Sequence, residues 1–296
     1  MVKDTFARFH PFINLLYFTA VIGFAMFFTH PVCLAVSLLC ALTYCVYIGG
    51  RKAVRFSLKY MLPVLIITAL LNPAFNHQGA TILAYLPGGN PLTLESILYG
   101  VAAAVMLVTV ISWFSCFNAV MTSDKLVYLL GRAIPSLSMI FSMALRFVPR
   151  FRAQIKIIST AQKCIGRDVA SGNILRRAKH GIKILSIMIT WALENAIETA
   201  DSMKGRGYGL PGRTAFSIFR FDRRDLCALV YILSCAAAVV AGTIAGAYRF
   251  RYFPTVAGEW TGMTVIVFAA YFALGALPIA VNLIEDIVWK SMKSKT

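Results

Sequence analysis

Long stretches without a charged residue dominate the hydropathy pattern of this chain. They cover residues 9–50, 60–94, 96–123, 226–248 and 260–284. A helix needs about 20 apolar residues to cross the hydrocarbon core of a bilayer, so each of the last four stretches can hold one span. The first stretch is long enough for two spans, separated at Thr29-His30-Pro31. The pattern therefore predicts an all-α polytopic membrane protein with about six transmembrane helices.

The charged residues are few and unevenly distributed. The 296 residues are 59% hydrophobic and 14% charged, whereas a water-soluble domain carries about a quarter charged residues. Of the net charge of +17, +11 falls within residues 124–225, which hold 18 Lys and Arg against 7 Asp and Glu. This segment is too long for a connector and too basic to lie in lipid. The chain therefore divides into a membrane part at 1–123, a basic segment at 124–225 and a second membrane part at 226–296.

The positions of Lys and Arg predict the orientation of the spans. Under the positive-inside rule, Lys3 and Arg8 place the N-terminus in the cytoplasm, and the basic segment and the C-terminus lie on the same side. The third span is short, at residues 60–71, unless Arg55 and Lys59 snorkel. Residues 72–90 then form an external loop without Lys or Arg. If only one of the third and fourth segments crossed, the basic segment would lie outside, so both are expected to cross.

Amphipathic helices are predicted inside the basic segment. Residues 133–149 are apolar, and Pro149 is expected to kink or end the helix they form. From Arg150 to about Lys163, apolar and basic side chains occupy different helix faces, a pattern that also suits a helix resting on anionic lipid. A longer helix over about residues 182–204 carries an apolar stripe. The stripe includes Leu185, Ile189, Leu193 and Met203.

The end of the longer helix carries the most distinctive chemistry. Arg206 lies between Gly205 and Gly207. Gly207 fits a left-handed helix cap, and Arg206 suits the negative end of the helix dipole. An arginine without side chains beside it can enter a groove on a partner and pair with a carboxylate. The glycines up to Gly212 and Arg213 also match nucleotide-binding patterns, but those patterns need a preceding strand, so no nucleotide site is expected here.

These residues resemble a known family, the transmembrane T component of energy-coupling factor transporters, which are modular ABC importers of vitamins and metal ions. The resemblance is carried by Leu145-Arg146-Phe147-Val148-Pro149, by Ala161-Gln162, by Leu193-Glu194-Asn195-Ala196, by Ala200-Asp201-Ser202-Met203 and by Gly205-Arg206-Gly207-Tyr208-Gly209. It implies two long cytoplasmic coupling helices, each ending in a small-Arg-small triplet that docks into an ATPase subunit. It makes Arg206, flanked by Gly205 and Gly207, the second coupling arginine.

The first triplet departs from the family pattern. After Gln162 and Lys163 the family has a small residue, then Arg, then Gly, but this chain reads Cys164-Ile165-Gly166 with Arg167 next. Three readings are open at this end. Arg167, which we favour, or Lys163 acts from a shifted position, or the helix docks by shape and apolar contact alone.

The resemblance implies a non-catalytic scaffold in the plasma membrane of a prokaryote. Two ABC ATPase subunits would bind ATP and Mg²⁺, and a membrane-embedded S component would bind the vitamin or metal ion. This chain would join them without a catalytic residue, cofactor or metal of its own. The apolar faces of the coupling helices, including Leu185, Ile189, Leu193 and Met203, would pass the motion of the ATPases to the S component.

Two other classes fit the residues less well. A secondary transporter normally carries ionisable residues inside its spans, which here almost lack them. A polytopic membrane enzyme would use acid pairs such as Glu194 and Glu198, or clustered ligands, and the four His and seven Cys fall at no metal or redox spacing. Nucleic acid is not an expected partner, because the positive-inside bias already explains the sign of the basic segment.

Overall fold

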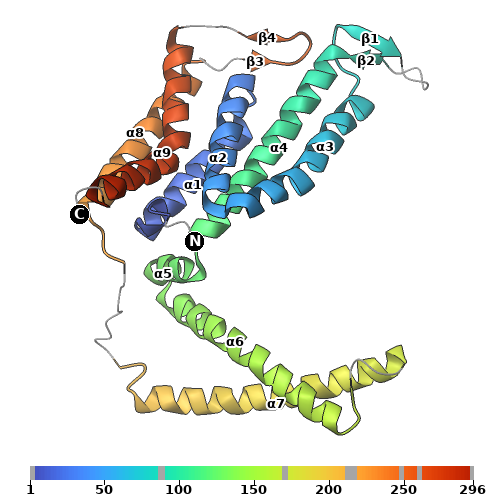
Figure 1. Ribbon diagram of the computed structural model, residues 1–296, viewed down its shortest axis with the longest axis vertical. Coiled ribbons are helices and arrows are strands. Elements are labelled where there is room, and N and C mark those ends of the chain that lie inside the picture. Colours follow the sequence, from blue (N-terminus) through green and yellow to red (C-terminus); the bar gives the residue numbers. More distant parts are fainter. Residues whose placement is uncertain are drawn as a thin grey trace. The chain divides into compact units, whose positions relative to one another are not determined.

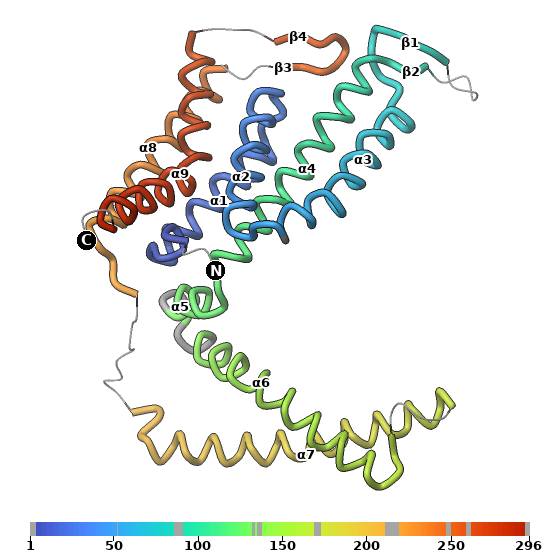
Figure 2. Tube along the Cα trace, in the orientation of Figure 1, coloured from blue at the N-terminus to red at the C-terminus, as the bar shows by residue number. Residues whose placement is uncertain are grey.

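The computed structural model of the chain is almost entirely helical, with two short hairpins (Figures 1 and 2). It describes residues 4–85, 91–168, 173–210, 219–246, 250–258 and 262–293. Lys3, Gly212 and Arg213 lie outside these ranges. The chain forms two compact units, Met1–Leu126 with Phe219–Thr296, and Val127–Ile218. We call the first the membrane unit and the second the basic unit.

Five helices of the membrane unit are long and apolar enough to cross a bilayer, which confirms the all-α polytopic prediction. They are Pro31–Arg51, Ala53–Phe75, Leu94–Val120, Arg223–Ile244 and Gly262–Lys293. The first predicted span forms α1 (Pro11–Phe27), a shorter apolar helix of 17 residues. At 1.5 Å rise per residue its length is about 26 Å, slightly less than the hydrocarbon core. Pro31 begins α2 at a position that needs no backbone N–H, which explains the separation of the first two spans.

The third span extends beyond residues 60–71. Helix α2 (Pro31–Phe56) continues into α3 (Leu62–Phe75) through a π-helical turn, η2 (Ser57–Met61), and the only break is at Gly50 with φ 53° and ψ −140°. The span runs from Ala53 to Phe75, as expected if Arg55 and Lys59 snorkel, and not over residues 60–71 alone. Both side chains are exposed, so they can reach water while their backbone stays helical.

The core of the membrane unit is built from aromatic rings. Phe6 in η1 (Phe6–Arg8), Tyr17, Phe18, Tyr44 and Trp113 are fully buried. Phe6 packs edge-on against Tyr17, with ring centroids 5.0 Å apart, which is a favourable geometry for two aromatic quadrupoles. These rings come from η1, α1, α2 and α4 (Leu94–Val120), so the cluster holds the N-terminal helices together.

Polar side chains tie the N-terminal turn to the last helix. Asp4 accepts hydrogen bonds from the Tyr44 hydroxyl (2.8 Å) and from the Asn282 amide (2.8 Å). The Asn282 side-chain oxygen accepts a third bond from the backbone N–H of Thr5 (2.7 Å). Because polar groups in an apolar environment are costly unless paired, this network specifies how α9 (Gly262–Lys293) packs on the start of the chain.

Two antiparallel hairpins connect membrane helices and were not predicted. One pairs β1 (Ile82–Tyr85) with β2 (Pro91–Thr93), and the other pairs β3 (Phe250–Arg251) with β4 (Ala257–Gly258). A backbone hydrogen bond from Ala80 N–H to the Pro254 carbonyl (3.1 Å) joins the two connections. Both hairpins lie after helices that run the same way, α3 and α8 (Arg223–Ile244), so they meet at one end of the unit (Figure 1).

A buried lysine lies at the end of the membrane unit opposite the two hairpins. Lys125, in the first turn of α5 (Ser123–Ala133), is only 6% exposed. Its ammonium donates to the carbonyls of Ala7 and Val120, the latter at 3.0 Å. With the Asn14 amide turned so that its oxygen faces the ammonium, a third acceptor lies at 2.9 Å. Desolvation lowers the pKa of Lys125 to about 8, although Asp4 opposes this shift.

Candidate functional site

The basic unit is dominated by two long helices. Helix α6 (Pro135–Cys164) continues through Pro149, so of the two predicted effects of this proline, a kink or an end, the end was wrong. A proline removes one backbone donor, and the remaining bonds of a 30-residue helix suffice to keep it continuous here. Helix α7 (Ile174–Gly205) begins well before the predicted residue 182, with the Asn173 side chain accepting from the Ile174 N–H (2.7 Å). The first turns of α7 carry four basic or His residues, and these interrupt the apolar periodicity from which the start of the helix was predicted.

The two helices pack through one small apolar cluster. Its buried members are Ile158 from α6 with Ile184 and Met188 from α7, and Phe151, Ile187 and Trp191 pack against them. The Phe151 and Trp191 rings meet edge-on, with centroids 5.7 Å apart. The predicted apolar stripe of α7 lies largely outside this contact, since Leu185, Ile189 and Leu193 are 58%, 52% and 62% exposed.

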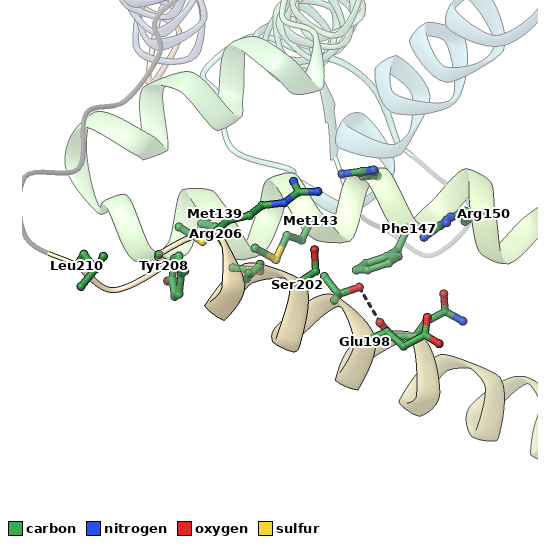
Figure 3. A pocket seen from close by; sticks show the side chains of 14 residues that line it. Met139, Met143, Phe147, Arg150, Glu198, Ser202, Arg206, Tyr208 and Leu210 are labelled. Carbon is green, nitrogen blue, oxygen red and sulfur yellow. Dashed lines mark hydrogen bonds between the residues drawn. The ribbon is translucent and has the colours of Figure 1, made fainter.

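A groove of about 720 Å³ lies between α6 and the last turns of α7 (Figure 3). Its apolar lining comes from three α6 side chains and from Met203, Tyr208 and Leu210, and three arginines and one glutamate add charge. The α6 residues are Met139, Met143, Arg146, Phe147 and Arg150, and the rest are Asn195, Glu198, Thr199, Ser202, Met203, Arg206, Gly207, Tyr208 and Leu210. The groove thus brings together two motifs that lie about 50 residues apart in the chain and that sequence reasoning treated separately.

Helix α7 ends in a Schellman cap. The Gly207 N–H donates to the Lys204 carbonyl (3.0 Å), and the Tyr208 N–H donates to the Met203 carbonyl (3.0 Å). Gly207 has φ +76°, which confirms the predicted left-handed conformation. Arg206 follows the last helical residue with φ −89° and ψ 11° and is exposed. Within the described part of the chain it makes no ion pair, and Figure 3 shows its side chain beside Met139 and Met143.

Helix α6 ends in the same cap. The Gly166 N–H donates to the Lys163 carbonyl (3.0 Å), the Arg167 N–H donates to the Gln162 carbonyl (2.9 Å), and Gly166 has φ +78°. Ile165 has φ −90° and ψ 10° and is 66% exposed.

Comparing the two caps, Ile165 occupies the position of Arg206, and Arg167 occupies the position of Tyr208. Ile165 was not among the predicted docking residues because it is not basic, although Gly166 could have been aligned with Gly207.

These features define a class of protein: a polytopic all-α membrane protein whose basic unit presents two helices with matching capped ends. Among the residues described, no group of three or more His, Cys, Asp or Glu is placed to hold a metal ion. Residues 6–216, more than half of the chain, match the family model described as cobalt transport protein, CbiQ. The chain therefore belongs to this family, the transmembrane T components of energy-coupling factor transporters.

Relatives carry the same designation. The chain is 30% identical over 203 residues to the energy-coupling factor transporter transmembrane protein EcfT of Ruminiclostridium cellulolyticum, a match covering 64% of this chain and 75% of that protein. It is 27% identical over 235 residues to EcfT of Bacillus selenitireducens, covering 75% of this chain and 87% of the relative. It spans only 36% of the length of EcfT from Lactobacillus helveticus, with 34% identity over 101 residues. The family places the chain among transporter membrane subunits rather than enzymes.

Proposed function

We propose that this chain is the energy-coupling scaffold of an ABC importer of the energy-coupling factor type. It transmits the ATP-driven motion of two ATPase subunits to a membrane-embedded S component that takes up a vitamin or a metal ion. ATP and Mg²⁺ are bound by the ATPase subunits, and this chain contributes no catalytic residue or cofactor. The observation that carries the proposal is the pair of identically capped helices in a chain of this family.

The end of α7 is suited to docking on an ATPase subunit. Arg206 is exposed beyond the last helical residue, and no neighbour lies within 4 Å of where a Cβ would stand on Gly205. A planar guanidinium that a partner can approach from the Gly205 side can form a bidentate pair with a carboxylate in a groove. The end of α6, which closes with the same cap, is the second docking region.

The exposed stripe of α7 is suited to the S component. Leu185, Ile189 and Leu193 recur every four residues on one face and lie outside the contact with α6. A row of exposed apolar side chains on a helix is stabilised when another apolar surface covers it. Met203 lies at the end of the same helix and lines the groove instead, where its flexible side chain can adjust to a moving partner.

The charge distribution supports a cytoplasmic location for the basic unit. With 18 Lys and Arg against 7 Asp and Glu in residues 124–225, this segment and both termini lie on the inner side of a prokaryotic plasma membrane under the positive-inside rule. That side is where ATP is available to the partner subunits.

Co-purification with the energy-coupling ATPase subunits of the same organism tests the proposal. Arg206→Glu places a negative charge at the docking turn and is expected to reduce the retained ATPase at least about tenfold, with loss of transport-coupled ATP hydrolysis. Arg176→Glu, an exposed charge reversal near the start of the same helix, is the matched control and should retain the ATPase. Full retention with Arg206→Glu would overturn the proposal.

A further inference from the structure

The two helix ends have the same backbone but different side chains at the docking position. The dihedral angles of Arg206 and Ile165 agree to within one degree. Both residues are followed by a left-handed glycine and are closed by the same pair of backbone hydrogen bonds. Because identical caps project the capping side chain in the same direction relative to the helix axis, Ile165 is presented at the end of α6 as Arg206 is presented at the end of α7.

The basic residues near the α6 end do not fill this position. Lys163 corresponds to Lys204 of α7, so α7 carries a lysine at that point in addition to its arginine. The Lys163 ammonium is also 3.4 Å from the Asp168 carboxylate. Arg167 corresponds to Tyr208, two residues beyond the capping position. Neither Lys163 nor Arg167 therefore occupies the capping position that Arg206 occupies at the end of α7.

We infer that Ile165 is the docking side chain of α6, and that the ATPase groove receiving it is apolar where the groove for Arg206 offers a carboxylate. This inference rests on the proposed function. An isoleucine pressed against a carboxylate would bury an unpaired charge, whereas an apolar pocket gains stability from removing its exposed surface from water.

Four substitutions test this inference in the complex with both ATPase subunits. Ile165→Glu is expected to reduce the ATPase retained through α6 about tenfold or more, and Ile165→Arg is expected to reduce it as well. Ile165→Leu keeps the apolar surface and should retain the complex, and so should Arg167→Ala. An unchanged complex with Ile165→Glu, a stronger complex with Ile165→Arg, or loss of the complex with Arg167→Ala would overturn the inference.

The outcome is separable from that of the proposed function. If Arg206→Glu releases the ATPase and Ile165→Glu does not, the scaffold role stands and the role of Ile165 fails. If neither variant releases it, the proposed function fails.

Cys164 supplies a direct readout, because it is exposed and adjoins Ile165. A photoactivatable maleimide on Cys164, with Cys164→Ser as the control, should label apolar residues of one ATPase subunit. Labelling centred on an acidic cluster would contradict the inference.

Discussion

The buried ammonium of Lys125 makes the stability of the membrane unit depend on pH. We consider the substitution Lys125→Met, which keeps the length of the side chain but removes its charge and its donors. The change leaves the carbonyls of Ala7 and Val120 and the oxygen of Asn14 without their donor. A buried acceptor without a partner costs about 1–3 kcal/mol, and this is partly offset because an ammonium no longer has to be desolvated.

The pH dependence follows from the pKa of Lys125, which burial lowers from 10.5 to about 8. Between these two values the unfolded chain binds the proton and the folded protein releases it, so the free energy of unfolding rises with pH across this window. The rise is about 1–2 kcal/mol between about pH 7.5 and 9.5, allowing for partial solvent screening. Lys125→Met lacks this contribution, so its deficit relative to the wild type should grow by that amount.

Equilibrium unfolding by SDS in detergent micelles, followed by tryptophan fluorescence at the two pH values, measures the deficit. Lys156→Met, which removes an exposed lysine of α6, is the matched control and should show no such pH dependence. A deficit of Lys125→Met that stays constant or shrinks as pH rises would refute the reasoning.

Four further substitutions probe packing and docking. Gly207→Ala forces a Cβ into the left-handed region at a cost of about 1–2 kcal/mol and should lower ATPase retention several-fold, whereas Gly205→Ala keeps helical geometry and should be tolerated. Gly242→Val should reduce the monodisperse fraction in gel filtration, because even a Cβ there would clash with a Val267 methyl group, and overpacking of this kind costs about 1–3 kcal/mol. Leu193→Asn should weaken co-purification of the S component but leave the ATPase subunits bound.

The membrane helices were predictable because their signal is local. A run of apolar residues without charge leaves the backbone in lipid no alternative to a helix. The limits of the third span depended on whether Arg55 and Lys59 snorkel, because a spanning helix can contain these residues only when their side chains reach water. Pro149 does not end α6, since a long helix can lose one hydrogen bond without ending.

The candidate site was partly predictable. The cap at Gly207 follows from a local rule, because a left-handed residue is almost always glycine. The groove was not predictable, because it forms only when the start of α6 lies beside the end of α7, and nothing in either segment alone specifies that pairing. Ile165 was missed because residue type, rather than position relative to the following glycine, guided the search.

The apolar cluster formed by the described residues of α6 and α7 has a mechanical consequence, because it lies closer to the end of α6 than to the end of α7. At 1.5 Å per residue, Ile165 is about 10 Å beyond Ile158, the last α6 residue in the cluster, and Arg206 is about 22 Å beyond Trp191. For equal rotation about this fulcrum, the tip of α7 travels about twice as far as the tip of α6. If two ATPase subunits bound to these helix ends and closed symmetrically, the displacement at the end of α7 would therefore be larger than the displacement at the end of α6.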